Sequence, residues 1–209
     1  VLALDDDARI VLEPRMTGRI QLAEPADRDH LRLVIELSGG SDSRLFFWDS
    51  RGLGVVQLLT AAQHQRLLGQ DRLGPDALEI SLETLRARLG ASRRAIKVAL
   101  MDQQAIAGIG NIYASEILHR ARLHPELPCC ELRALDWLAL HQAIVEVLEE
   151  AIRHEGSTLR DGMYATAANV SGGFQLLHRV YQRHTLACLQ CRRGRIRRIV
   201  QAQRSSFYC

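Results

Sequence analysis

The sequence has very little lysine and no long apolar run. Lys97 is the single lysine among 27 basic residues, so the cationic side chains are almost all arginines, whose planar guanidinium groups suit two-point recognition of phosphate. No stretch of eighteen apolar residues occurs, so no membrane-spanning helix is expected. Residues 1–18 lack the basic start and uninterrupted apolar core of a secretory signal. We therefore expect a soluble globular protein with no membrane partner.

The chain also lacks the cysteine density of a disulfide-stapled domain. Five cysteines in 209 residues argue against a disulfide framework in a chain of intracellular character. Cys129 and Cys130 are adjacent and follow Pro128, which favours a reduced pair near a helix start over a pair of metal ligands. The other three cysteines all lie within the last 22 residues.

Acidic residues are absent from the C-terminal segment. Residues 178–209 hold eight arginines and no aspartate or glutamate, whereas the rest of the chain holds 19 basic and 24 acidic side chains. A basic segment on an acidic body is typical of proteins that bind a polyanion. The alternative is a merely solvated basic tail, and the clustering of the arginines around a cysteine pair counts against it.

Hydrophobic periodicity predicts an α+β fold. Short β-branched or alternating stretches within the first sixty residues predict strands over 8–13, 19–23, 30–37, 44–49 and 54–60. No helix of useful length separates them, so we expect an antiparallel meander that forms part of a sandwich or barrel. Helical spacing and capping residues then predict helices over 61–70, 81–90, 92–103, 111–123 and 131–156.

The same pattern predicts three domains. Residues 1–60 would form a partial β-sandwich domain, 61–177 a helical domain and 178–209 a hairpin segment. Within the second domain, residues 163–175 are small, polar and glycine-bearing, which predicts a mobile surface loop.

Three cysteines of the C-terminal segment have the spacing of a metal site. Cys188 and Cys191 form a Cys-x-x-Cys knuckle, and Cys209 ends the predicted hairpin. Structural zinc takes four ligands in a tetrahedron, so a second knuckle would place the fourth ligand three residues after Cys209. His184 is an alternative ligand, although it precedes the first knuckle and would strain the hairpin. Three unconnected thiols are the weaker interpretation.

Glycines flank the start of the helix predicted at 111–123. Gly108 and Gly110 would let a phosphate approach the backbone, where free N–H groups and the helix dipole bind it. We expect Asn111 to cap this helix and to donate a side-chain hydrogen bond. An ordinary tight turn is the alternative, but Lys97 and the basic C-terminal segment favour phosphate binding.

These motifs resemble those of the formamidopyrimidine-DNA glycosylase family, bacterial base-excision enzymes related to endonuclease VIII. The resemblance spans essentially all 209 residues and is carried by "GIGNIYASEIL" with "HP", "QRSSFYC", "MTG" and "WDSRGLG". It implies a β-sandwich portion, a helix–two-turn–helix domain and a zinc-finger hairpin. It also implies a monomer in the bacterial cytoplasm, associated with the nucleoid, that acts on double-stranded damaged DNA.

The implied activity is that of a bifunctional DNA glycosylase/AP lyase. Such an enzyme removes oxidised purines, 8-oxoguanine and formamidopyrimidines, through an amine that displaces the base and forms an imine, followed by β,δ-elimination. The resemblance makes Arg204 catalytic, in the δ-elimination step. It makes Met16 and Arg51 the side chains that enter the void left by a flipped base. Other implied DNA contacts are His30, Arg93, Lys97 and Asn111.

The resemblance also assigns a cofactor and a loop. One structural zinc ion would be held by Cys188, Cys191 and Cys209. Residues 163–175 would cover the flipped base.

The chain departs from the family pattern at its start. The family's proline nucleophile, its acidic glutamate and its β-elimination lysine are not found, and the chain begins at Val1. Leu53 stands where an aromatic wedge is expected, and Gly52 where a second arginine is expected. We favour a core fragment that lacks the N-terminus and the last zinc ligand. The alternatives are a non-catalytic DNA-binding relative and an endonuclease VIII-like enzyme for oxidised pyrimidines.

Overall fold

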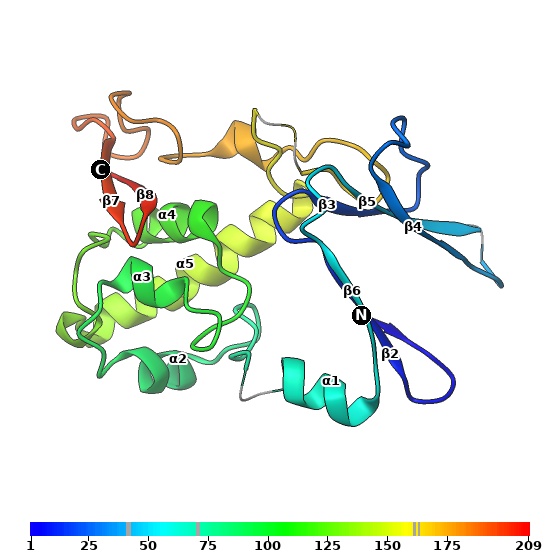
Figure 1. Cartoon of the computed structure of the whole chain (residues 1–209). Coiled ribbons are helices and arrows are strands. Elements are labelled where there is room, and N and C mark those ends of the chain that lie inside the picture. Colours follow the sequence, from blue (N-terminus) through cyan, green and yellow to red (C-terminus); the bar gives the residue numbers. More distant parts are fainter. Residues whose placement is uncertain (41–42, 70–71, 161, 163) are drawn as a thin grey trace. The chain divides into compact units, whose positions relative to one another are not determined.

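A computed structural model describes residues 1–40, 43–69, 72–160, 162 and 164–209 (Figure 1). Its N-terminal strands are β1 (Leu2–Ala3), β2 (Arg9–Glu13), β3 (Gly18–Gln21), β4 (Leu31–Glu36), β5 (Arg44–Asp49) and β6 (Val55–Leu59). They form two three-stranded antiparallel sheets, in the orders β1-β2-β6 and β3-β5-β4. The predicted strands and the predicted α+β class are therefore confirmed.

The predicted meander is wrong, because β2 pairs with β6 and β3 pairs with β5 across intervening strands. Burial explains this pairing. Phe46 and Phe47 of β5 and Val11 and Leu12 of β2 are the buried apolar residues of these strands, so β5 and β2 take the central positions. A strand flanked on both sides removes more apolar surface from water than an edge strand does.

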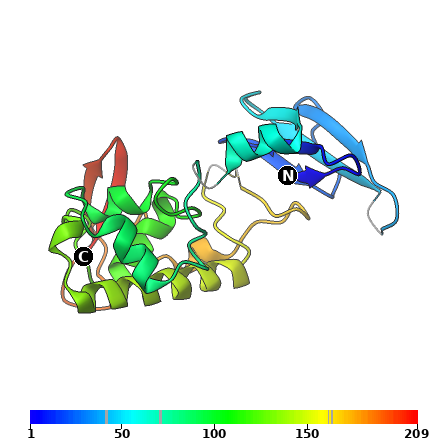
Figure 2. The same ribbon diagram turned by 90° about the horizontal axis from the view of Figure 1, so that it is seen from below.

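The helices follow in chain order, and Figure 1 and Figure 2 show them from two directions. Their bounds are α1 (Ala61–Leu68), α2 (Leu82–Leu89), α3 (Ile96–Leu100), α4 (Asn111–Arg120) and α5 (Ala134–Arg153), with 3-10 turns η1 (Cys129–Glu131) and η2 (Phe174–Leu177). As expected, Ser81 caps α2 by accepting a hydrogen bond from Thr84 N, and Gly90 ends this helix. None of the helices in the described part of the chain is long and apolar enough to cross a membrane.

The helix predicted over 92–103 is much shorter than expected. Residues 92–95 are not helical, because the carbonyl oxygens of Ser92 and Arg94 accept hydrogen bonds from the N–H groups of Cys130 and Cys129. The segment thus pairs with residues 128–130, and α3 begins only at Ile96. Long-range pairing overrides local helix propensity here.

The predicted C-terminal hairpin is confirmed. Strands β7 (Arg197–Gln201) and β8 (Arg204–Tyr208) are joined by Ala202 and Gln203, both with positive φ (45° and 62°). Two positive φ values are the signature of the type I′ turn that suits a two-residue hairpin. Strand β8 lies beside α4, as both ribbon views show.

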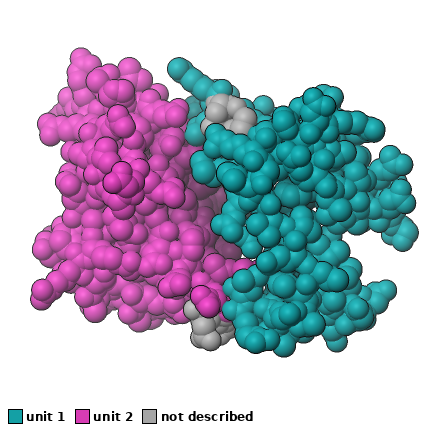
Figure 3. All heavy atoms as spheres, viewed as in Figure 1, with its two compact units in different colours: residues 1–67, 151–176 teal, residues 68–150, 177–209 magenta. Residues whose placement is uncertain are grey.

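The chain divides into two compact units (Figure 3). Unit 1 comprises residues 1–67 and 151–176, and unit 2 comprises residues 68–150 and 177–209. The core of unit 2 contains fully buried aliphatic side chains from four helices, including Leu85, Ile96, Leu100, Ile117, Leu140 and Ile144. The three-domain boundaries at 60 and 177 remain a prediction.

Candidate nucleic-acid interface and metal site

One predicted DNA-contacting residue, Asn111, and the predicted catalytic residue, Arg204, share a pocket in unit 2. Asn111, in the first turn of α4, and Arg204, at the start of β8, both line it. Gly110, the N-cap of α4, also lines it, and a Cβ placed on this glycine would meet no heavy atom within 4 Å. The backbone at this helix N-terminus is therefore open to an approaching ligand.

Lys97 makes hydrogen bonds to Asn111 and to β8, the two elements that bring Asn111 and Arg204 to this pocket. Its side chain is fully buried, and Nζ donates to Asn111 Oδ1 at 2.6 Å, to the Ser205 carbonyl at 2.9 Å and to Ser206 Oγ at 2.8 Å. Burial, and then the nearby charge of Arg204, lower the pKa of Lys97 to about 8. Lys97 thus joins the start of α4 to the strand that carries Arg204, and its three donors are used inside the protein.

The predicted capping role of Asn111 is wrong. The N-cap of α4 is Gly110, and Asn111 is the first helical residue, with no side-chain capping bond at this terminus. The reason is that Lys97 occupies the side-chain oxygen of Asn111. The amide NH₂ of Asn111 remains as the donor end of the side chain.

The neighbouring arginines behave differently from each other. Arg93 is exposed and is not among the residues that line the pocket, whereas Arg94 lines it. Arg94 Nη1 donates to Asp102 Oδ2 at 2.7 Å, and this hydrogen bond lowers the pKa of Asp102. Sequence reasoning missed Arg94, because the sequence does not show which of two adjacent arginines points into the pocket. The non-helical backbone over residues 92–95 sets the direction of each side chain, and the sequence alone does not reveal it.

A buried carboxylate in unit 1 holds the segments that carry Met16 and Arg51. Asp49 accepts hydrogen bonds from Thr17 Oγ1 (2.6 Å), Gly54 N (2.7 Å) and Arg51 N (3.3 Å). Burial alone would raise the pKa of Asp49, but these hydrogen bonds outweigh it and lower the pKa overall. Met16 is 74% exposed and Arg51 is also exposed, so both remain accessible.

Sequence reasoning missed Asp49. Its signal was its place in "WDSRGLG", directly after an apolar strand and before a glycine-bearing turn. His30 is adjacent, because its carbonyl accepts the N–H of Asp49 at 2.9 Å. The His30 ring packs edge-on against Trp48, with centroids 5.5 Å apart.

The described part of the predicted loop 163–175 is tied at several points, while Met163 lies outside the described residues. Leu22 N donates to the Ala167 carbonyl at 2.8 Å, and Gln21 Nε2 donates to Asn169 Oδ1 at 2.6 Å. The loop is therefore hydrogen-bonded to the end of β3 within unit 1.

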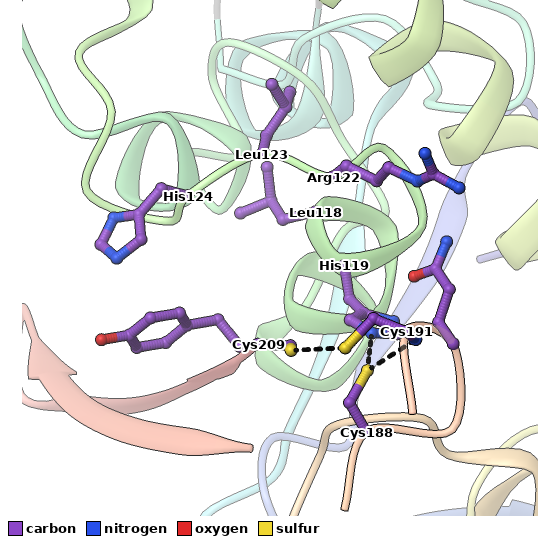
Figure 4. A pocket seen from close by; sticks show the side chains of 10 residues that line it. Leu118, His119, Arg122, Leu123, His124, Cys188, Cys191 and Cys209 are labelled. Atoms are coloured by element: carbon purple, nitrogen blue, oxygen red, sulfur yellow. Dashed lines mark hydrogen bonds between the residues drawn. The ribbon is translucent and has the colours of Figure 1, made fainter. Parts of the chain in front are cut away.

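The three C-terminal cysteines come together in unit 2. The sulfur atoms of Cys188, Cys191 and Cys209 all lie within 4.8 Å of one another, and Cys191 Sγ is 3.6 Å from Cys209 Sγ (Figure 4). This cluster can hold a metal ion, as the spacing predicted. His184, the alternative ligand, is exposed and is not part of the cluster.

The backbone of the knuckle is arranged around the thiols. Gly194 N donates to Cys191 Sγ at 3.3 Å, and Cys188 N donates to the Gly194 carbonyl at 2.9 Å. The N–H groups of Gly194 and Arg193 lower the pKa of Cys191 to about 7, which favours the thiolate that binds metals. A Cβ on Gly194 would lie 2.9 Å from Cys209 Sγ, so glycine is required beside this cluster.

Helix α4 supports the C-terminal segment through two further buried side chains. Glu116 accepts the N–H groups of three consecutive residues, Arg179, Val180 and Tyr181, at 2.8–3.0 Å. Burial raises the pKa of Glu116, and the three hydrogen bonds only partly offset it. One turn later, His119 Nε2 lies 3.4 Å from Cys188 Sγ, and this side chain was not expected from the sequence.

Comparisons with known proteins agree with this geometry. The family model "Formamidopyrimidine-DNA glycosylase H2TH domain" matches residues 73–162. A formamidopyrimidine-DNA glycosylase of Desulforamulus reducens is 37% identical over 214 residues, which cover all of this chain and 75% of the relative. One of Methylobacterium radiotolerans is 38% identical over 232 residues, covering 99% of this chain and 77% of the relative.

Solved structures give the same result. The MutM (Fpg) protein from Thermus thermophilus superposes with a TM-score of 0.86 at 36% identity, covering 99% of this chain and 76% of that one. Fpg of Lactococcus lactis in complex with DNA containing an abasic site gives 0.82 at 29% identity, covering 98% and 74%. This chain belongs to the formamidopyrimidine-DNA glycosylase family.

Proposed function

We propose that this chain is the DNA-binding part of a bifunctional DNA glycosylase/AP lyase, which removes 8-oxoguanine and formamidopyrimidines from damaged duplex DNA in base-excision repair. The observation that carries the proposal is the pocket shared by Asn111 and Arg204 at the N-terminus of α4. The Lactococcus lactis relatives crystallised with abasic-site and Fapy-dG DNA support the same class of ligand. We propose that the protein acts as a monomer on nucleoid DNA in the bacterial cytoplasm.

The chemistry of the pocket suits one backbone phosphate. Asn111 offers its amide NH₂, because Lys97 occupies the amide oxygen, and Arg204 offers a guanidinium. The N-terminus of a ten-residue helix adds backbone N–H groups and a favourable dipole. A phosphate held by Arg204 beside the lesion would also be the leaving group that this arginine assists in δ-elimination.

The remaining roles follow from placement within each unit. We propose that Lys97 positions Asn111 and β8, and that exposed Arg93 and half-buried His30 contact DNA. In unit 1, exposed Met16 and Arg51 would enter the void left by the flipped nucleotide, held in place through Asp49. The loop 163–175 would cover the extruded base.

We also propose that the cluster of Cys188, Cys191 and Cys209 holds one structural zinc ion. Thiolates about 2.3 Å from a tetrahedral zinc ion lie about 3.8 Å apart. The 3.6 Å between Cys191 Sγ and Cys209 Sγ matches this edge, so the residues present fit the ion. A zinc ion there would fix the knuckle to the end of β8 and so hold Arg204 in its hairpin.

A second candidate is a DNA-binding protein without lyase chemistry, since Lys97 is not free to form a Schiff base. A Schiff-base mechanism needs a free, unprotonated amine. Lys97 is the single lysine of the chain, and its Nζ makes three hydrogen bonds in a buried site.

Borohydride trapping separates the two candidates. The protein expressed from its whole gene is incubated with an 8-oxoguanine duplex and borohydride, beside a duplex that carries an oxidised pyrimidine. We expect a covalent adduct with the 8-oxoguanine duplex. Tight binding without any adduct would establish the non-catalytic candidate, and preferential trapping of the pyrimidine duplex would contradict the proposed substrate class.

A binding assay tests the phosphate pocket on its own. Asn111→Ala and Arg204→Ala should each weaken binding to duplexes with and without a lesion alike, and Arg204→Ala, which removes a charge, should also flatten the dependence of log affinity on log salt. Loss of affinity confined to lesion-bearing duplex would contradict a phosphate role for Asn111.

A further inference from the structure

His119 is a buried polar side chain that the proposed DNA contacts do not use. It lies in the last turn of α4, is 8% exposed, and points its Nε2 at Cys188 Sγ, 3.4 Å away (Figure 4). A metal-bound thiolate accepts hydrogen bonds and donates none. With Cys188 as a metal-bound thiolate, the imidazole nitrogen that faces it must therefore carry the proton.

The backbone of the Cys-x-x-Cys knuckle donates a shorter hydrogen bond to Cys191 than to Cys188. The N–H of Gly194 reaches Cys191 Sγ at 3.3 Å, whereas the N–H of Cys191 reaches Cys188 Sγ only at 3.5 Å. Cys188 is the buried member of the cluster, and leaving a buried acceptor without a donor costs free energy. A proton on His119 Nε2 would supply the hydrogen bond that solvent supplies to an exposed thiolate.

The geometry also separates a donor from a fourth ligand. The three thiols lie within 4.8 Å of one another, and His119 is not a member of that group. Its Nε2 instead makes its hydrogen bond with one of the three sulfur atoms, that of Cys188. A ligand would approach all three sulfur atoms equally, as the corner of a tetrahedron does.

We propose that His119 is a positioning residue for the metal, whose Nε2–H donates to the Cys188 thiolate and ties the knuckle to α4. The inference rests on the proposed zinc site. Asn111 begins the same helix and Glu116 anchors residues 179–181 to it. One rigid helix would then carry the phosphate contact at its start and the support of the metal site at its end.

Matched variants test the hydrogen bond. The protein from its whole gene is loaded with zinc, and metal transfer to a chromogenic chelator is followed for His119→Phe, His119→Gln and His184→Gln. Loss of an outer-shell partner typically costs about 10–100-fold in metal affinity. We expect His119→Phe to hold zinc about 10–100-fold more weakly, whereas His119→Gln, which keeps an N–H donor, stays within about threefold of wild type.

The control is the exposed His184, four residues before the knuckle, whose replacement should leave zinc affinity unchanged. Zinc affinity of His119→Phe within twofold of wild type would overturn the proposal. So would equal losses in the Phe and Gln variants, because packing rather than hydrogen bonding would then explain them. A wild-type protein that binds no zinc would overturn the zinc site itself, and with it this inference.

A measurement on the wild-type protein covers the case in which the variants do not fold. Histidine ¹⁵N spectra of the ¹¹³Cd-loaded protein should show one exchange-protected Nε2–H, with a proton–cadmium coupling transmitted through the sulfur. A cadmium coupling directly to an unprotonated Nε2 would make His119 a ligand and overturn the donor role. An unprotected, uncoupled His119 proton would overturn it as well.

Discussion

Each unit holds its predicted DNA-facing residues through one buried charged side chain, and the two differ in how the charge is satisfied. Asp49 of unit 1 receives hydrogen bonds from a hydroxyl and two backbone N–H groups, which lower its pKa and keep it ionised despite burial. Lys97 of unit 2 has only neutral acceptors, and burial together with Arg204 lowers its pKa to about 8.

This difference in hydrogen-bond partners separates a site whose charge is satisfied within the protein from one that can accept an opposite charge from a ligand. The charge of Asp49 is satisfied by hydrogen bonds within unit 1, and these bonds hold the segments that carry Met16 and Arg51. The Lys97 site carries two cations, Lys97 and Arg204, and the acceptors around Lys97 bear no negative charge. A DNA phosphate in the Asn111 pocket would supply the opposite charge that favours the protonated lysine.

The largest expected effect comes from removing the lysine. Lys97→Met leaves Asn111 Oδ1, Ser205 O and Ser206 Oγ without their shared donor, and a buried unsatisfied acceptor costs about 1–3 kcal/mol. We expect the free energy of unfolding in urea to fall by at least that amount, and affinity for an abasic-site duplex to fall more than tenfold. Lys97→Arg, which keeps the charge but not the geometry, is the control. Wild-type affinity in Lys97→Met would remove the lysine from the phosphate site.

The comparison also predicts an opposite pH response of the two sites. The pKa of Lys97 is about 8 in the free protein, and a bound phosphate would raise it, so DNA binding takes up a proton. Affinity for an abasic-site duplex should be constant below pH 8 and should fall up to tenfold per pH unit above it. Fluorescence anisotropy from pH 6 to 9.5 measures this. An equal slope in Lys97→Met would assign the proton to another group.

The Asp49 site should respond only at acidic pH. Its pKa is lowered from 3.8 in the folded state, so its stabilisation is fully present above about pH 4 and is lost as pH falls through the lower folded value. Asp49→Asn should cost about 1–3 kcal/mol at pH 7, measured by urea unfolding. The gap between the variant and wild type should narrow below pH 3.8. A gap that does not depend on pH would mean that charge plays no part in this site.

The smallest expected effect concerns the turn next to Arg204. Gln203 has a φ of 62°, a conformation that costs a side chain roughly 1–2 kcal/mol and costs glycine nothing. After the backbone entropy of glycine is subtracted, Gln203→Gly should stabilise the protein by about 0.5 kcal/mol. A small rise in Tm would show this, and a fall would indicate that the Gln203 side chain makes a stabilising contact.

Local features of the molecule could be predicted from sequence, and long-range ones could not. Strand β5 and the β7–β8 hairpin follow from alternation and turn spacing, and the cysteine cluster follows from the Cys-x-x-Cys spacing. The β2–β6 pairing, in contrast, joins residues more than forty positions apart, and nothing in either strand specifies the partner. The sequence therefore predicted the positions of the strands along the chain but not their order within the sheets.

The same limit applies within the candidate site. Asn111 was identified, but its capping role was not realised, because a lysine fourteen residues earlier takes its side-chain oxygen. Arg94, Asp49 and His119 have their places from tertiary contacts with Asp102, Thr17 and Cys188. Resemblance to a family predicts which residues contact DNA, whereas the residues that position them become visible only in three dimensions.

The central claim, that Asn111 and Arg204 grip one phosphate, can be tested by removing a single charge from the DNA. Abasic-site duplexes are made with a neutral methylphosphonate in place of each phosphate flanking the lesion in turn, and their affinities are measured for wild type and Asn111→Ala. We predict that one substitution weakens wild-type binding about tenfold or more and weakens Asn111→Ala binding by a smaller factor, because Arg204 still contacts the same phosphate in that variant. Additive losses at every flanking phosphate would contradict the claim.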